Sequence, residues 1–104
     1  MQVLISKRVH LVIEEFYDIA LLCHPALDEI TVIKKMQRLY DAMESLGKFA
    51  HIYPVARYKD DWIKMGYQEF ICEDFHFAYR IVENEYGHEV VLIEDACHSF
   101  LYHN

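Results

Sequence analysis

The chain has 104 residues, enough for one domain with a single hydrophobic core. Hydrophobic residues make up 54% of it, which argues against disorder, and no apolar run approaches the roughly 20 residues that a membrane-spanning helix needs. The 17 acidic and 10 basic residues give a net charge of −7. This charge disfavours a general nucleic-acid-binding surface, because phosphate backbones are bound mainly by Lys and Arg.

The first predicted elements are a short strand, "QVLIS", and a helix that begins near Lys7 and ends near Cys23. Ser6 is placed to cap this helix. Its apolar residues recur at helical spacing: Val9, Val12, Ile13, Phe16, Ala20 and Cys23. Pro25 disfavours helix at His24, so a short turn follows.

A second helix is predicted to open at 27–29 and to end at Gly47. Its apolar stripe contains Ile30, Ile33, Met36, Tyr40 and Met43, widened by Val32, Leu39 and Leu46. Because only a short turn separates the two helices, we expect an antiparallel hairpin whose apolar stripes face each other.

Three strands follow, over 67–72, 75–83 and 89–95, joined by turns at 73–74 and 83–88. The order is therefore β-α-α-β-β-β, and we predict a single α+β domain over residues 1–104, with an antiparallel sheet packed on an α-helical hairpin. The first strand joins the same sheet, against a neighbour that the sequence does not specify.

Alternation along the strand at 75–83 assigns its residues to two faces. Phe75, Phe77, Tyr79 and Ile81 share the face that packs on the helices, and His76, Ala78, Arg80 and Val82 share the other. The strand at 89–95 is apolar on both faces, with Glu94 and Asp95 at its end on opposite faces, so we expect it to be central and covered on both sides. A covered second face offers a concave place where Arg80 contacts a ligand, a carboxylate or a partner chain.

Arg80 is the one Lys or Arg between Met65 and Asn104, a segment with eight acidic residues. Two interpretations follow, and they do not exclude each other. One is an ion pair across the sheet with Glu69 or Glu94. The other is an oxyanion or phosphate contact through the planar guanidinium.

Other candidate residues lie around this face. His76 and His98 are the candidates for a general acid or base near Arg80, although each is individually more often a surface or a packed histidine. The stretch "RYKDDWIK" offers Arg57, Lys59 and Lys64 as binding residues around Trp62; its alternative interpretation is a solvated loop that Trp62 anchors to the core.

The sequence predicts neither a metal nor another cofactor, since His98 and His103 are five positions apart with no third ligand indicated. The three cysteines, at 23, 72 and 97, lie far apart and are odd in number, which is more typical of a reducing cytosol than of an exported protein. The opening "MQVLIS" lacks the basic and long apolar regions of a signal peptide, so we expect a cytoplasmic protein.

The element order, the "YRI" of the strand at 75–83 and the H-x-x-x-Y near the end together resemble the RelE/ParE superfamily of toxins from type II toxin–antitoxin (plasmid stabilisation) systems. The resemblance covers nearly the whole chain. In the RelE branch it implies cleavage of messenger RNA on the ribosome. Arg80 then matches the arginine of the family's "YR" strand, and His98 and Tyr102 match its C-terminal catalytic positions.

The family's basic residues on the preceding strand have no counterpart here, where the sequence offers Gln68 and Glu69. The ParE branch, which inhibits DNA gyrase without an RNase site, therefore suits this acidic chain better. Either branch implies neutralisation by a cognate antitoxin, no DNA binding by the toxin alone and a possible homodimer. A family member that keeps the fold as a non-toxic interaction module is the third alternative.

Overall fold

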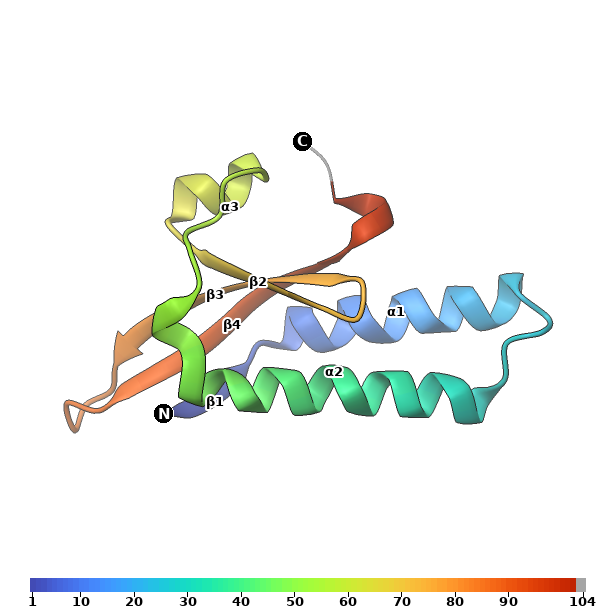
Figure 1. The fold of residues 1–104 in the computed structure, drawn as a ribbon, viewed down its shortest axis with the longest axis horizontal. Helices are drawn as coiled ribbons and strands as arrows, with labels where there is room; N and C mark the ends of the chain where they lie inside the picture. Colours follow the sequence, from blue (N-terminus) through green and yellow to red (C-terminus); the bar gives the residue numbers. More distant parts are fainter. Residues whose placement is uncertain (103–104) are drawn as a thin grey trace.

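The computed structural model describes residues 1–102 and arranges them as a sheet with a helical hairpin on one face and a short helix on the other (Figure 1). The strands are β1 (Gln2–Ile5), β2 (Gln68–Cys72), β3 (Phe75–Glu83) and β4 (Glu89–His98). The helices are α1 (Lys7–Cys23), α2 (Glu29–Phe49) and α3 (Asp60–Met65), and two 3₁₀ turns cover Ala50–Ile52 (η1) and Ser99–Leu101 (η2). Within this part of the chain, no helix is long and apolar enough to cross a membrane.

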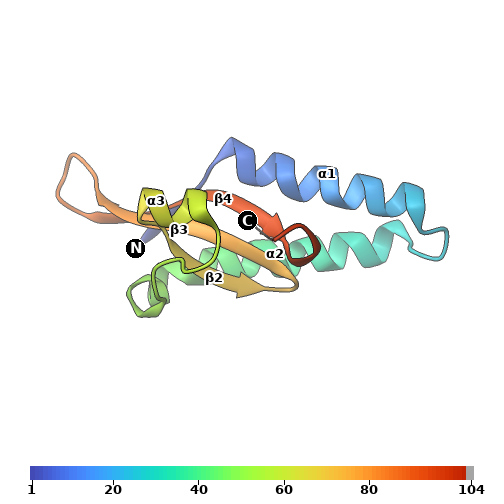
Figure 2. The ribbon, with the colours of Figure 1, turned by 90° about the horizontal axis from the view of Figure 1, so that it is seen from above.

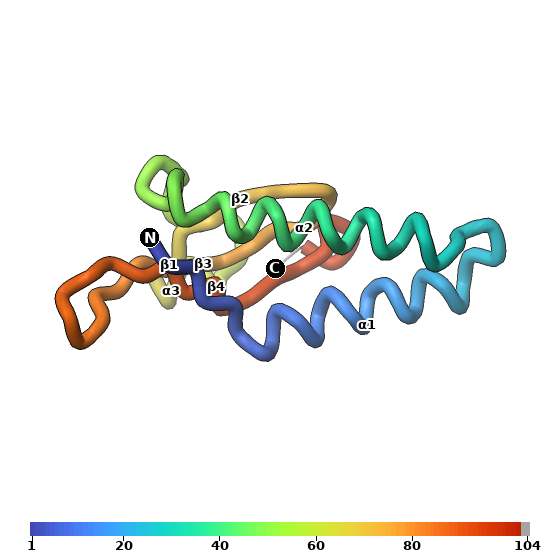
Figure 3. Tube along the Cα trace, turned by 90° about the horizontal axis from the view of Figure 1, so that it is seen from below, coloured from blue at the N-terminus to red at the C-terminus, as the bar shows by residue number. Residues whose placement is uncertain are grey.

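Side-chain caps begin both long helices. The hydroxyl of Ser6 accepts a hydrogen bond from the amide of Val9, as predicted, and Asp28 accepts one from the amide of Thr31. The two helices lie side by side and antiparallel, and their connected end projects beyond the sheet (Figures 1 and 3). Ile30 and Ile33 lie near that end and are exposed, so their predicted place in the buried stripe is wrong.

Gly47 does not end α2, which continues to Phe49. A Cβ at this position would collide with the carbonyl oxygen of Met1, and the amino group of Met1 donates a hydrogen bond to the Gly47 carbonyl oxygen at 3.1 Å. Gly47 therefore serves the close approach of the chain start to α2 rather than a helix stop.

The strand order in the sheet is β1-β4-β3-β2. The pairs β2–β3 and β3–β4 are antiparallel, as predicted, and β4 is central. β1 pairs with β4 in parallel, so the sheet is mixed and the expectation of an antiparallel sheet is wrong for this strand. The two-helix crossover carries the chain from β1 to β2, at the opposite edge of the sheet. The position beside β1 is therefore taken by the last strand, β4.

A bulge in β4 changes which face its acidic residues occupy. Ala78 pairs with Asp95 but Tyr79 pairs with Ile93, so Glu94 is an extra residue in β4. Strict alternation had predicted opposite faces for Glu94 and Asp95, whereas both side chains contact residues on the face away from the hairpin. β4 then continues to His98, three residues beyond the predicted end.

The two faces of the sheet carry two separate apolar clusters. Phe75, Phe77 and Tyr79 are fully buried against the hairpin, as the alternation predicted. On the other face, which we call the outer face, α3 and the loop before it cover the sheet (Figure 2). Trp62 of α3 is buried there with Ala78. The stretch around Trp62 thus contains a helix that the sequence did not predict, and the predicted anchoring role of Trp62 is confirmed.

Candidate functional site

Three largely buried polar side chains meet on the outer face: Glu69 of β2, His76 of β3 and Tyr102, which follows η2. We call them the Glu69 cluster. One carboxylate oxygen of Glu69 accepts a hydrogen bond from the Tyr102 hydroxyl at 2.7 Å, and the other lies 2.8 Å from Nδ1 of His76. The rings of His76 and Tyr102 stack with their centroids 3.7 Å apart. Each member therefore contacts both others.

Two hydrogen bonds of the cluster end on Glu69. An ionised carboxylate only accepts hydrogen bonds, so Glu69 accepts from His76 through a proton on Nδ1. Burial raises the pKa of Tyr102 well above its ordinary value of 10.0, and the hydrogen bond to Glu69 raises it further. Tyr102 thus stays protonated at neutral pH and donates a hydrogen bond to Glu69, and Nε2 of His76 is the candidate base of the cluster.

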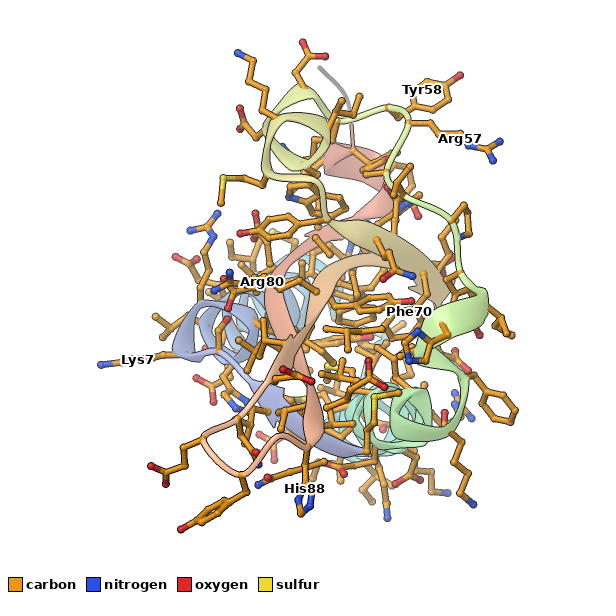
Figure 4. The ribbon with its side chains drawn as sticks, turned by 90° about the vertical axis from the view of Figure 1, so that its left-hand side faces the viewer. Lys7, Arg57, Tyr58, Phe70, Arg80 and His88 are labelled. Atoms are coloured by element: carbon orange, nitrogen blue, oxygen red, sulfur yellow. The ribbon has the colours of Figure 1, made fainter. Side chains whose placement is uncertain are left out.

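A groove of about 430 Å³ borders the Glu69 cluster. Its walls are the loop at 53–58 and β2, with Tyr102 at one side. Arg57 lines it and is exposed, and Figure 4 shows Arg57 and Tyr58 extending from the loop away from the body of the protein. The groove therefore places the exposed guanidinium of Arg57 beside two members of the Glu69 cluster, Glu69 and Tyr102.

Arg80 lies elsewhere on the outer face, and Figure 4 shows it directed away from Arg57. Its Nε lies 3.6 Å from a carboxylate oxygen of Glu94, with half of the Arg80 side chain exposed. The same Glu94 oxygen accepts a long hydrogen bond from the Tyr67 hydroxyl at 3.5 Å. Of the two predicted ion-pair partners, the structure selects Glu94, and a phosphate contact by Arg80 stays a prediction.

The buried pair of Trp62 and Ala78 separates Arg80 from His76. Ala78 lies between these two residues on β3 and is fully buried. The indole nitrogen of Trp62 donates to Asp95 at 2.9 Å, and the other oxygen of Asp95 accepts from Arg8, also at 2.9 Å. The concave place that we expected for Arg80 is thus filled at its centre by the chain itself.

His98 lies on the other side of the sheet from His76, so the expected grouping of His98 with Arg80 is wrong. His98 is buried against the hairpin, where its ring stacks on Phe16 at a centroid distance of 3.9 Å. The β4 bulge is the physical reason, because it moves Asp95 and Cys97 to the outer face and turns His98 inward. Tyr102, four residues later, returns to the outer face.

The remaining predicted binding residues are spread over the loop and α3. The amino group of Lys59 lies 5.8 Å from the centroid of the Trp62 ring, and Lys64 is exposed in the last turn of α3. Among residues 1–102, no group of three His, Cys, Asp or Glu side chains could hold a metal ion. His103, considered above with His98, lies outside the described residues.

From the sequence, Glu69 was expected only as a partner for Arg80, and its central place in the cluster was not predicted. A signal was present in the two-residue turn at 73–74, which pairs Cys72 with Phe75 and hence Ile71 with His76. Glu69 then lies diagonally across from His76 on the same face, within reach of a long side chain. The contribution of Tyr102 depends on η2, which local sequence does not predict.

Comparisons of the chain with models of known protein families, with curated proteins and with solved structures gave no match.

Proposed function

We propose that this chain is the toxin component of a type II toxin–antitoxin pair, with a fold of the RelE/ParE kind, neutralised by a cognate antitoxin. The observation that carries the proposal is the topology. A two-helix hairpin on one face links β1 to the rest of a sheet of order β1-β4-β3-β2, in which the first strand is parallel to the last. The resemblance of the sequence was based on the order of helices and strands along the chain. The topology adds the order and direction of the strands in the sheet.

Within that family, inhibition of a protein target, DNA gyrase, suits the outer face better than RNA cleavage. A phosphodiester transition state needs several cations at the reacting group. Here Arg80 and Arg8 are each paired with a carboxylate, Glu94 and Asp95, and α3 covers the centre of the face. The net charge of −7 also favours a protein surface, above all a basic one, over a polyanion.

A ribosome-dependent mRNA endonuclease is the second candidate, and the Glu69 cluster is the specific observation that favours it. The cluster offers a candidate base at Nε2 of His76, and its other two members, Glu69 and Tyr102, line a groove that Arg57 also lines. General acid–base catalysis of this kind contributes roughly 10²–10⁴-fold to a rate. A non-toxic interaction module of the same fold is the third alternative.

Controlled expression of the chain in a bacterial host tests the proposal. We expect growth arrest that co-expression of the product of the adjacent gene relieves. Growth that continues at full rate, with soluble protein present, would contradict toxicity in that host. A stable complex between the two products without any effect on growth would instead support the interaction module.

Matched variants separate the two toxic mechanisms. Glu69→Gln and His76→Gln remove the acid–base function of the Glu69 cluster, and the protein-inhibition mechanism predicts that both still arrest growth. Primer extension on host mRNA after expression provides the second measurement. If the unchanged chain produces ribosome-dependent cuts and both variants do not, the endonuclease mechanism is supported and protein inhibition is contradicted.

A further inference from the structure

Residues 98–102, which we call the C-terminal strap, connect the two faces of the sheet. The strap begins at His98, buried against the hairpin, and ends at Tyr102, which is bonded to Glu69 on the outer face. It also borders two grooves. His98, with Phe100, lines a groove of about 610 Å³ beside α1, and Tyr102 lines the groove of about 430 Å³ beside the Glu69 cluster. A change in the strap therefore alters both faces.

The imidazole of His98 is the anchor of the strap. It stacks on Phe16 with an interplanar angle of 13° and on Phe100 with one of 18°, and Phe75 meets it edge-on at a centroid distance of 5.1 Å. The residue is 8% exposed. These ring contacts suit a neutral imidazole, because a charged ring buried among phenyl groups loses its hydration.

A hydrogen bond imposes the same requirement. Nδ1 of His98 accepts a hydrogen bond from the backbone amide of Phe100 at 3.2 Å and so caps η2. A protonated imidazole carries hydrogen on both nitrogens and cannot accept a hydrogen bond. The cap therefore exists only while His98 is neutral.

The next residue provides a hinge that does not depend on pH. The backbone amide and the hydroxyl of Ser99 both donate to the carbonyl oxygen of Asp74 at 2.8 Å. These bonds hold the start of the strap to the turn between β2 and β3. Release of the strap would thus pivot at Ser99 and displace the residues that follow it.

The charged and titratable groups around His98 come from each element packed against it. The turn before β3 contributes Asp74, and β3 contributes His76. α1 and β4 contribute the groove-lining residues Arg8, Glu15, Cys23, His24 and Cys97. Burial lowers the pKa of His98 below its ordinary value of 6.5, Asp74 raises it in part, and His76 lowers it.

We propose that the C-terminal strap is a pH-sensitive latch: protonation of His98 breaks the cap on Phe100, releases Tyr102 from Glu69 and His76, and opens both grooves. The inference concerns the chain's own contacts and does not depend on the proposed function. The docked strap favours neutral His98, whereas release takes Phe100 off one face of the ring, lets water reach it and moves the pKa of His98 back toward its ordinary value of 6.5. Docking is therefore fully stabilised above about pH 6.5 and weakens as the pH falls below that value.

NMR on the full chain tests the latch with two measurements. A histidine that titrates without releasing the strap would not change both of them over the same pH range. One is the protection of the Phe100 amide from hydrogen exchange, corrected for the intrinsic rate. The other is the contact between the ring protons of Tyr102 and His76. From about pH 8 to about pH 5, the range in which histidine titrates, we expect Phe100 protection to fall several-fold and the ring contact to disappear in parallel.

Two variants divide the roles of the His98 ring. His98→Asn keeps an acceptor in the place of Nδ1 but does not titrate, so Phe100 protection and the Tyr102–His76 contact should persist at every pH. His98→Phe keeps the ring stack without an acceptor, so Phe100 should be unprotected even at about pH 8. His24→Gln, a substitution elsewhere in the lining of the same groove, should behave like the unchanged chain.

The latch would be overturned if both readouts persisted after His98 had titrated completely in the unchanged chain. It would equally be overturned if His98→Asn lost Phe100 protection over the same pH range, because the cause would then lie in another group. His76 is the main alternative cause, and it is retained in that variant. If His98→Asn does not fold, pH-independent protection of Phe100 in His98→Phe contradicts the latch by itself.

Discussion

At the scale of single residues, the carboxylate of Glu69 is the atom group that organises the outer face. Each of its oxygens has one partner, Tyr102 or His76, and the Glu69 side chain is only 12% exposed. A buried carboxylate with a missing partner is costly, since it loses water without a replacement. The cluster therefore contributes to stability whether or not it catalyses a reaction.

Tyr102→Phe tests this contribution directly, because it removes the hydroxyl and keeps the ring on His76. We expect the free energy of unfolding to fall by about 1.5–3 kcal/mol, as is typical for a hydrogen bond to a charged group. Urea denaturation measures the change. Tyr58→Phe is the matched control: Tyr58 is 71% exposed, and its change should stay within about 0.5 kcal/mol. Equal losses in the two variants would contradict the role of the hydroxyl.

For Arg80 we expect the opposite, a side chain whose ion pair contributes little to stability. Its contact with Glu94 is 3.6 Å long and half of its side chain is exposed, so solvent screens the pair. A double-mutant cycle with Arg80→Ala and Glu94→Gln should give a coupling energy below about 1 kcal/mol. A coupling energy above about 2 kcal/mol would show that the pair is a structural element of the fold.

The alternation of β3 predicted the inner and outer faces of the sheet around Phe77 and Arg80 correctly, because that strand is regular. It failed in β4, where the extra residue Glu94 shifts every later side chain by one face. Nothing in "LIEDACH" identifies the bulge, since acidic residues are compatible with either face. His98, a candidate beside Arg80, lies beyond the predicted end of this strand, and the bulge turns it to the inner face.

At the scale of elements, α3 is the part of the fold that the sequence did not predict. Six residues show too little periodicity to identify a helix, and the helix is held by tertiary contacts rather than by its propensity. Trp62 provides these contacts through burial over Ala78 and a hydrogen bond to Asp95. The helix and the cover of the outer face should therefore depend on Trp62.

Trp62→Ala should lower the free energy of unfolding by about 3–5 kcal/mol, because it leaves a cavity over the sheet. Trp62→Phe, which removes only the hydrogen bond to Asp95 and part of the ring, should cost much less. Ile63→Ala in the same helix is the control, since Ile63 is 43% exposed. A loss for Trp62→Ala no larger than that for Ile63→Ala would contradict the account of α3 as a docked cover.

At the scale of the whole molecule, the chain presents an acidic body with its cations dispersed. The helical hairpin, the sheet and α3 form three layers (Figure 1). The Glu69 cluster and Arg80 lie on either side of the contact between Trp62 of α3 and Ala78 of β3. The α+β layers followed from element order and amphipathic spacing. The parallel pairing of β1 with β4 could not be predicted in this way. It joins residues about ninety positions apart, and no local sequence pattern indicates such a pairing.

We propose a toxin that acts on a protein rather than on RNA, because α3 covers the centre of the outer face and Arg80 is paired with Glu94. The supercoiling activity of purified DNA gyrase in the presence of the purified chain tests this claim most directly. We predict that supercoiling falls as the chain is added, that Glu69→Gln inhibits equally, and that the cognate antitoxin restores activity. Full supercoiling at saturating amounts of folded chain, together with ribosome-dependent mRNA cleavage that Glu69→Gln abolishes, would contradict it.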